Sequence, residues 1–429
     1  MYGNFMLIKM QVDSGDIGEL QVNVVDRNNV PIKDARVIIR RPRQIGDEQQ
    51  NQMQQIEELN TDASGQTQTV DLNTPPLAYS LDENNDIQPY ANYDVEVDAP
   101  GYETENIENV EILAKELAIQ NVKMRRVEGN EQENINIPPH TLYYEYPAKI
   151  PEDDIKDVSE PGEIVLSRVV IPEYVVVHDG TPSSNARDYY VTYKDYIKNV
   201  ASSEIYATWP QATLEANILA IMSFTLNRVY TEWYRNKGKD FTITSSTAYD
   251  QKWINGRNIF ESISLVVDNI FDQYLSLPGV RQPILTQYCD GRRVTCPNWL
   301  SQWGSCNLGE QGYSTLEIIR NYYGDEMYIN TAEQISGIPA SWPGYNLDIG
   351  ASGQKVQQMQ EQLDTIANVY TNIPRVTADG IYGEGTQASV KAFQKIFDLP
   401  QTGIVDFATW YKISQIYVGI TRIAEGIPR

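Results

Sequence analysis

Apolar and polar residues alternate with a period of two in the first part of the chain. Residues 19–26 and 93–97 follow this pattern, and residues 35–40 form a third apolar run. Turn residues separate the runs, as at 61–65 and 99–101. Alternation bounded by turns is typical of short, half-buried strands. We therefore predict an N-terminal β-sandwich, and we assign residues 1–126 to it.

The middle of the chain changes to helical spacing. A buried strand over 169–180 precedes one helical pattern that starts at Tyr193 and a second from about 211 to 237. Pro210 suits the first turn of that second helix, and Gly238 suits its end. A further helix is expected over 260–275, and short helices after it. These patterns predict a central α+β domain over residues 164–338.

A third pattern predicts a small helical bundle over residues 345–420. Apolar residues recur at three- and four-residue spacing in three segments, and turn-rich sequences around 379–383 and 400–406 separate these segments. The fold class is therefore a multidomain α+β protein that ends in three helices.

Residues 127–163 differ from the domains on both sides. The segment holds ten acidic and two basic residues, together with five prolines that prevent long regular elements. We predict an acidic linker, which is the kind of segment where proteases cut. Its tyrosines at 143, 144 and 146 are expected to dock on a neighbouring domain.

Charge and hydropathy exclude several classes of partner. The net charge of −24 argues against a nucleic-acid partner, because phosphates attract Lys and Arg. No apolar run is long enough for a membrane span. The first residues lack the basic and apolar regions of a standard secretory signal, so no such signal is expected.

Three cysteines lie within one short segment. Cys289 and Cys296 flank a turn-rich sequence and could form a local disulfide across a hairpin, or remain free thiols with Cys306. A zinc site is disfavoured, because the chain has only two histidines, His140 and His178, both far away in sequence. We expect no metal and no cofactor.

The candidate for chemistry is Glu204, which lies in a short link between two helical patterns. Ile205, Tyr206 and Trp209 follow it and could bury the carboxyl group. Burial raises the pKa of a carboxyl toward the range of a general acid. The residues alone also allow a solvated glutamate at a helix end.

Two blocks carry a resemblance that favours the first interpretation. NVASSEIYATWP, around Glu204, and SQWGSCNLGEQGYSTLEIIRNYY, from residue 301, are similar to the stage II sporulation protein D family of lytic transglycosylases. The resemblance implies that Glu204 is the single catalytic acid and base, and that the sugar's own C6 hydroxyl attacks the anomeric carbon. It also implies two substrate contacts, Tyr288 and Gln302. Tyr206 and Trp209 are further candidates that could stack on sugar rings, or belong to the aromatic core.

The chain departs from that family on the long helix after Glu204. The family commonly carries a Lys and an Arg there, and the corresponding positions are Glu215 and Met222. The loss of two cations leaves open a non-catalytic, wall-binding scaffold.

The other domains carry resemblances of their own. The N-terminal strands are similar to carboxypeptidase-regulatory-like domains, and the C-terminal pattern, with DGIYG and TGIVD, is similar to three-helix peptidoglycan-binding domains. The order of domains and the block PHTLYYEYP resemble clostridial spore-cortex-lytic enzyme precursors. That resemblance implies a spore protein, located in the cortex or at the cortex–coat boundary. It would be a zymogen that a subtilisin-like germination protease cuts in the linker, and it would act on cortex glycan strands.

A hydrolase is a further alternative. A muramidase would need a second acid beside Glu204, and Asp195, Asp250 and Asp290 are candidates. An amidase normally needs zinc or a His–Cys pair, and the histidines for it are lacking.

Overall fold

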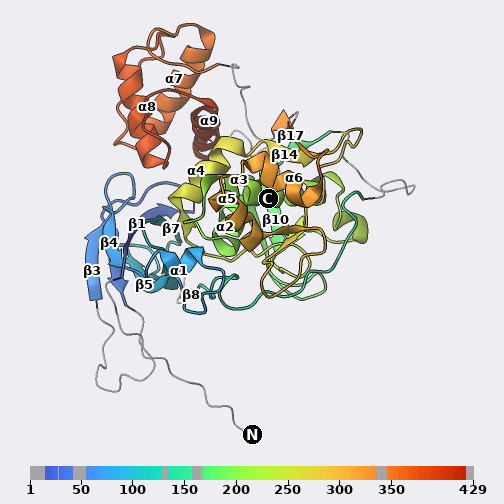
Figure 1. Cartoon of the computed structure of the whole chain (residues 1–429). Helices are drawn as coiled ribbons and strands as arrows, with labels where there is room; N and C mark the ends of the chain where they lie inside the picture. Colours follow the sequence, from blue (N-terminus) through green and yellow to red (C-terminus); the bar gives the residue numbers. More distant parts are fainter. Residues whose placement is uncertain are drawn as a thin grey trace, which may run out of the picture.

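The computed structural model describes residues 15–27, 29–41, 55–127, 134–156, 166, 168–332, 334–335 and 345–421. Three bodies follow one another along the chain: a β-sandwich, a central domain of helices and short strands, and a helical C-terminal domain (Figure 1). The mixed α+β class and the helical C-terminal domain are confirmed. Parts of the predicted linker, residues 128–133 and 157–163, lie outside the described residues.

Two sheets form the N-terminal domain. One has the strand order β3–β2–β5–β6–β8, and the other has the order β13–β7–β1–β4. Alternate side chains of β1 are buried between the sheets, as the period-two pattern predicts. The strands of this domain are β1 (Ile17–Asp26), β2 (Arg36–Arg40), β3 (Gln55–Asn60), β4 (Val70–Asn73), β5 (Ala91–Asp98), β6 (Glu105–Ile112), β7 (Leu117–Met124) and β8 (Asn134–Asn136). A short helix, α1 (Ala78–Leu81), lies between β4 and β5.

The central domain contributes a strand to the N-terminal sheet. β13 (Ile259–Phe260) pairs antiparallel with β7, with Ile259 opposite Ile119 and Phe260 opposite Ala118. Next to this pairing, Arg257 forms a buried ion pair with Glu111 at 2.8 Å. Shared backbone hydrogen bonds and a buried ion pair join the two domains over a continuous core.

Helices α2 (Tyr193–Glu204) and α3 (Gln211–Tyr230) form the centre of the central domain. α2 begins at Tyr193 as predicted, and the hydroxyl of Thr192 accepts a hydrogen bond from the backbone N–H of Asp195 at this end. α3 ends seven residues before the predicted end at Lys237. The reason is Glu232, whose φ of 45° is incompatible with a right-handed helix.

Shorter elements surround these two helices. The predicted helix over 260–275 is α4 (Glu261–Ile270), and it is followed by a strand, β14 (Gln273–Ser276). The helices on the C-terminal side are α5 (Gln302–Glu310) and α6 (Thr315–Tyr323). The remaining strands of this region are β9 (Val170–Ile171), β10 (Tyr174–His178), β11 (Asp188–Thr192), β12 (Ile243–Thr244), β15 (Tyr288–Cys289), β16 (Leu300–Ser301), β17 (Tyr328–Thr331) and β18 (Gln334–Ile335).

Part of the predicted linker is bound to the central domain. The backbone N–H of Ile150 donates to the carbonyl of Ala248, and Asp154 accepts from the N–H of Leu285. The carboxylate of Glu152 forms a partly buried ion pair with Arg228 of α3. Residues 150–156 therefore belong structurally to the central domain, although their composition suggests a solvated linker.

The C-terminal domain contains α7 (Gln354–Ala367), α8 (Glu384–Ile396) and α9 (Phe407–Thr421). Two buried glutamines hold its loops in the same way. The side chain of Gln360 accepts from the N–H of Gly380 and donates to the carbonyl of Ile381. Gln394 makes the corresponding bonds to Gly403 and Ile404. The domain therefore contains an internal structural repeat of helix and loop.

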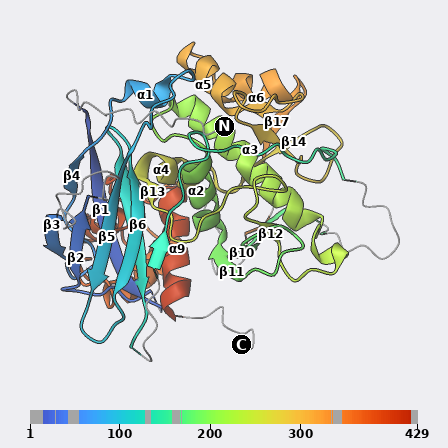
Figure 2. The ribbon, with the colours of Figure 1, turned by 90° about the horizontal axis from the view of Figure 1, so that it is seen from below.

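This domain contacts both others. α9 lies beside α4 in two perpendicular views (Figures 1 and 2), and the ring of Tyr411 packs edge-on against Phe271 at 5.4 Å. On the other side, the amide of Asn372 donates to Asp62 of the sandwich. The C-terminal domain thus rests on the junction of the other two.

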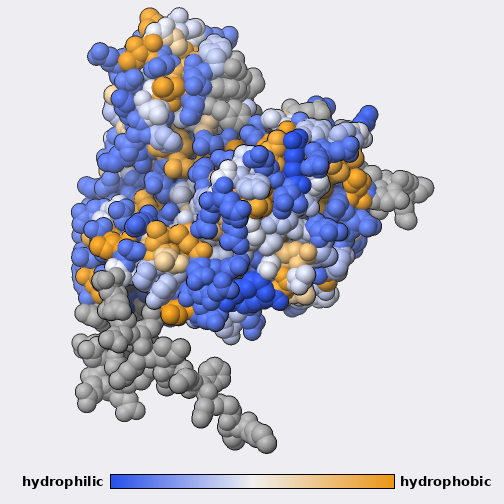
Figure 3. Space-filling view, viewed as in Figure 1, coloured by the Kyte–Doolittle hydropathy of each residue, from blue (hydrophilic) through white to orange (hydrophobic). Residues whose placement is uncertain are grey.

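The molecular surface is mainly hydrophilic on the face seen in Figure 3, where hydrophobic residues form separate small patches. Among the described residues, no helix is long and apolar enough to cross a membrane.

Candidate active site

Glu204 is the last residue of α2, and its side chain is completely buried. The chain turns into extended backbone at Ile205, so the carboxyl group points away from the helix into the domain core. One oxygen, Oε1, accepts a hydrogen bond from the backbone N–H of Lys252 at 2.6 Å. The other oxygen, Oε2, is buried, and the Tyr288 hydroxyl is close enough to the carboxyl group to favour its charged form by hydrogen bonding.

Burial raises the pKa of Glu204 above its ordinary value. The largest opposing influence is the ammonium group of Lys149, and the Tyr288 hydroxyl and the N–H of Lys252 act in the same direction. The net effect is a carboxyl group with increased proton affinity, which is the property of a general acid. The solvated glutamate at a helix end is therefore excluded by the structure.

Lys149 comes from the segment predicted as linker, and its side chain is buried. Its ammonium group donates to the carbonyl of Asp250 at 2.6 Å and lies 4.2 Å from the centre of the Tyr288 ring. Burial lowers the pKa of Lys149, whereas the charges of Glu204 and Asp250 oppose this. A cation from outside the central domain thus faces the candidate acid.

Two tyrosine hydroxyl groups lie in the same interior. Tyr288, on β15, and Tyr146, from the predicted linker, are buried. The Tyr288 hydroxyl faces the Glu204 carboxyl group, whereas the Tyr146 hydroxyl has no hydrogen-bond partner among the described residues. Burial and the charge of Glu204 raise the pKa of both groups. Glu204 and Tyr288, both predicted from the sequence, therefore lie together in the buried interior of the domain.

Tyr206 and Trp209 form an aromatic cluster with Trp303. The ring centres of Trp209 and Trp303 are 5.1 Å apart, and those of Tyr206 and Trp303 are 6.0 Å apart. The cluster is covered by the N-terminal part of the chain. The ring of His140 stacks on Tyr206 at 4.5 Å, and the indole N–H of Trp209 donates to the carbonyl of Ser80 in α1.

Gln302, the last predicted contact, is the first residue of α5 and is fully buried. Its side-chain amide has no hydrogen-bond partner on either atom. Trp303, the next residue of α5, belongs to the aromatic cluster, but adjacent residues of a helix do not face the same way, so this neighbour does not place the Gln302 side chain at the cluster.

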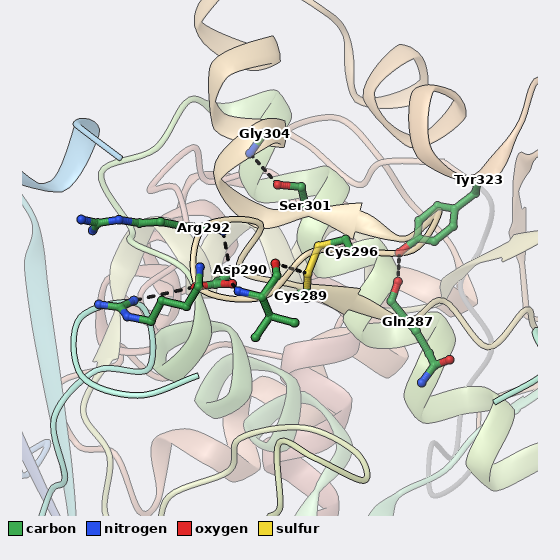
Figure 4. The surroundings of a disulfide bond; sticks show 10 residues. Gln287, Cys289, Asp290, Arg292, Cys296, Ser301, Gly304 and Tyr323 are labelled. Carbon is green, nitrogen blue, oxygen red and sulfur yellow. Dashed lines mark hydrogen bonds and ion pairs between the residues drawn. A yellow bond between two sulfur atoms is a disulfide. The ribbon is translucent and has the colours of Figure 1, made fainter. Parts of the chain in front are cut away.

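Cys289 and Cys296 are joined in a disulfide (Figure 4). Cys306 is a buried free thiol. The disulfide closes a loop that Asp290 organises, because the Asp290 carboxylate accepts from the backbone N–H groups of Arg292, Arg293 and Val294. The side chain of Arg293 then donates to the carbonyls of Leu142 and Tyr143, at 2.6 and 2.5 Å. The disulfide-closed loop is therefore hydrogen-bonded to the segment that leads to Lys149.

The three candidate second acids are all engaged elsewhere. Asp250 forms a buried ion pair with Arg228 at 2.7 Å and accepts from the Tyr234 hydroxyl. Asp290 holds the disulfide loop, and Asp195 accepts from the hydroxyl of Thr192 at the start of α2. None of them is a free carboxylate opposite Glu204.

The two family cation positions on α3 have other roles in this chain. Met222 is fully buried in the core, and Glu215 accepts a hydrogen bond from the hydroxyl of Thr315. His178 ends β10 and pairs with Asp188 at 2.7 Å. Among the residues that the structure describes, no group of three His, Cys, Asp or Glu side chains could hold a metal ion.

Sequence reasoning missed Lys149, His140, Arg293 and Trp303. Lys149 and His140 lie in a proline-rich, acidic stretch whose composition indicates a solvated linker. Of the three tyrosines expected to dock there, Tyr146 is buried, whereas Tyr144 is 62 % exposed. No local pattern marks these residues, because their neighbours come from distant parts of the chain.

Comparison with known protein families identifies one domain. Residues 352–413 match the family described as "Putative peptidoglycan binding domain". These residues comprise α7, α8 and about the first half of α9, in agreement with the predicted bundle. No curated protein matches the chain.

Solved structures give only partial similarities. The SleB N-terminal domain is 27% identical over 17% of this chain and 93% of its own, with a TM-score of 0.15. The minor pilin GBS52 of Streptococcus agalactiae is 14% identical over 27% of this chain and 48% of its own, with a TM-score of 0.18. Catechol 1,2-dioxygenase from Pseudomonas arvilla C-1 is 16% identical over 28% of this chain and 56% of its own, with a TM-score of 0.20. The family match alone therefore identifies part of the molecule: residues 352–413 form a peptidoglycan-binding domain, which gives the chain a cell-wall-associated role.

Proposed function

We propose that this protein is the zymogen of a lytic transglycosylase that cleaves spore-cortex peptidoglycan, with Glu204 as its catalytic acid and base. The observation that carries the proposal is the state of Glu204. It is a fully buried carboxyl group with raised pKa, and each candidate second acid is bound elsewhere. A hydrolytic mechanism normally needs a second carboxylate, as nucleophile or as base for water. A lytic transglycosylase needs only one.

The hydrogen bond from Lys252 assigns roles to the two oxygens of Glu204. Because Oε1 accepts from the Lys252 N–H, the acidic proton resides on Oε2. That proton passes to the glycosidic oxygen between N-acetylmuramic acid and N-acetylglucosamine as the bond to the anomeric carbon breaks. The C6 hydroxyl oxygen of the muramic acid then bonds to the same carbon and releases its proton to Oε2. The products are a 1,6-anhydro end and a free hydroxyl, and Glu204 regains its proton.

Residues of the N-terminal region cover Glu204 and its neighbours, which supports an enzyme that is inactive until it is cut. Ser80 of the sandwich holds Trp209, and the hydroxyl of Thr141 donates to the carbonyl of Ser203, next to Glu204. Lys149 reaches the interior that Glu204 faces. A glycan strand cannot reach Glu204 while these residues stay in place. A cut by a subtilisin-like germination protease in the segment 127–163 would permit the N-terminal region to leave.

The C-terminal domain supports a wall-bound enzyme. Its DGIYG loop, residues 379–383, includes Ile381, which is 60 % exposed. A second site that binds peptidoglycan raises the local concentration of the glycan at the first.

The test is the release of soluble sugar from purified cortex by the full chain after cutting in the linker. Replacement Glu204→Gln should lower the rate about a hundredfold or more, because it removes the proton that general acid catalysis requires. The matched control is Glu326→Gln, since Glu326 is an exposed glutamate that contacts no part of the site. Equal rates for the wild-type and Glu204→Gln proteins would contradict the proposal, and so would a lack of release from the cut wild-type chain.

A further inference from the structure

Residues 140–149 follow a path across the end of α2. At one end, the ring of His140 stacks on Tyr206, with 4.5 Å between the ring centres and an angle of 29°. At the other end, the ammonium group of Lys149 lies over the ring of Tyr288. Between them, Tyr146 is only 6 % exposed. The segment therefore spans the region from the aromatic cluster to Glu204.

Arg293 holds the middle of this segment through hydrogen bonds to two of its backbone carbonyl oxygens. Its guanidinium group donates to Leu142 and to Tyr143. The backbone of Arg293 is held independently of the segment, because its N–H donates to Asp290 at 2.9 Å inside the disulfide-closed loop. Arg293 therefore stays attached to the central domain when residues 140–149 leave, and loses both acceptors.

The contacts that this segment makes match those that an N-acetylated glycan would make. The ring of His140 covers the face of Tyr206, and an aromatic face of this kind also suits the apolar face of a sugar ring. The carbonyls of Leu142 and Tyr143 are amide carbonyls, and the acetamido groups of amino sugars carry the same acceptor. The cation of Lys149 faces Glu204, where positive charge develops on the sugar in an oxocarbenium-like transition state.

We propose that residues 140–149 occupy the glycan groove, and that Arg293 becomes a specificity-determining residue that binds the acetamido carbonyl oxygens of the glycan. This inference rests on the proposed function, because it takes Glu204 as the point of cleavage. The inference adds the path of the groove, which follows residues 140–149, and the chemical group of the glycan that the protein recognises, which is the acetamido group.

Two neutral glycans that differ only in the acetamido group test the role of Arg293. Chitotetraose carries this group on each ring, and cellotetraose has a hydroxyl in its place. Binding is measured by calorimetry in the Glu204→Gln background, so that no glycan is consumed. The linker is cut on the C-terminal side of Lys149, and the N-terminal fragment, which then includes residues 140–149, is separated. We expect chitotetraose to bind at least about tenfold more tightly than cellotetraose, since hydrogen bonds to a charged group have this strength.

Replacement Arg293→Ala should remove most of this preference. The matched control is Arg292→Ala in the same loop, because the side chain of Arg292 contacts Asn85 and Asp86 of the sandwich and not residues 140–149. Arg292→Ala should keep the preference. An unchanged preference in Arg293→Ala would overturn the role of Arg293, and so would an equal loss of preference in both variants.

A peptide of residues 137–156 tests whether segment and glycan share one groove. It should displace chitotetraose competitively, and His140→Ala with Lys149→Met in the peptide should weaken this effect. Binding of both ligands at once would overturn the proposal. Competition also separates the groove from the peptidoglycan-binding domain, where the peptide has no site. If groove binding depends on Arg293 while the cut wild-type chain releases no sugar from cortex, the groove stands and the proposed catalysis fails.

Discussion

Lys149 places its ammonium group 4.2 Å from the centre of the Tyr288 ring, although the two residues are 139 positions apart in the chain. The position of this cation links the N-terminal region to the candidate active site. Lys149 is also the strongest influence that opposes the burial-induced rise in the pKa of Glu204. Removal of this cation should therefore change the pKa of Glu204.

In the uncut chain, Lys149→Met should raise the pKa of Glu204 further. A methionine keeps most of the volume of the side chain and removes the charge that favours the carboxylate. The measurement is carbon NMR of labelled glutamate side chains across a pH titration, with Glu204→Gln to assign the signal. The control is Lys252→Met, because the side-chain charge of Lys252 has only a minor influence on Glu204. A pKa that stays the same or falls in Lys149→Met would contradict the assigned role.

The contact between the sandwich and the central domain should weaken as pH rises. Burial raises the pKa of Glu111 from 4.5 to about 7, although Arg257 opposes the rise. A carboxyl whose pKa is raised on folding stabilises the folded form most below its unfolded pKa, here 4.5. This contribution is lost as pH rises through about 7. Glu116, whose pKa burial also raises to about 7, acts in the same direction.

The rate at which the cut N-terminal fragment dissociates measures this effect. We expect the fragment to leave several-fold faster at pH 8 than at pH 5. The double variant Glu111→Gln with Glu116→Gln should show a nearly flat pH profile. A pH dependence that survives in the double variant would have to come from other groups.

Asp268 should be essential for the stability of the central domain. It is fully buried and pairs with Lys194 at 2.6 Å and with Lys198 at 2.7 Å. Burial alone would raise the pKa of Asp268, but these lysines outweigh it and hold the pKa well below the usual range. Replacement Asp268→Asn leaves buried cations unpaired and should cost about 3–5 kcal/mol of unfolding free energy.

Urea unfolding of Asp268→Asn tests this cost, with the exposed Asp325→Asn as control. The additional change Lys198→Met should recover part of the loss, because it removes one unpaired charge. If Asp268→Asn unfolded at the same urea concentration as the control, the ion pairs would contribute no net stability.

The disulfide should stabilise the loop that holds residues 140–149. Its cysteines are seven positions apart, so the closed loop is short and the expected contribution is about 2 kcal/mol. The variant Cys289→Ser with Cys296→Ser should lower the melting temperature and speed proteolysis at residues 140–149. The control is Cys306→Ser, since Cys306 forms no disulfide. Unchanged proteolysis in the double variant would show that Asp290 alone holds the loop.

The local pattern of apolar and polar residues predicts the individual helices and strands of this protein well. It does not predict which distant segments pair with one another. The alternation at 93–97 lies within β5, and the helix predicted from Tyr193 begins at that residue. In contrast, β13 has only two residues. It forms because Ile259 and Phe260 pair with β7, a strand that lies more than a hundred residues earlier in the sequence. Nothing in their immediate neighbourhood indicates this pairing.

The candidate site shows the same division. Glu204 and the residues near it were predicted from a motif, and the structure accounts for the burial of the carboxyl. Lys149 and Arg293 were not predicted as site residues, because isolated charged residues in a polar stretch are normally solvated. Burial of such charges depends on partners such as Asp250 and the carbonyls of Leu142 and Tyr143, which only the folded chain brings near.

The most direct measurement is mass spectrometry of the soluble fragments that the cut chain releases from purified spore cortex. If Glu204 acts alone, the fragments end in 1,6-anhydro-N-acetylmuramic acid, and these ends disappear in Glu204→Gln. Reducing ends in their place would contradict the account, because water would then be the nucleophile and a second carboxylate would be required.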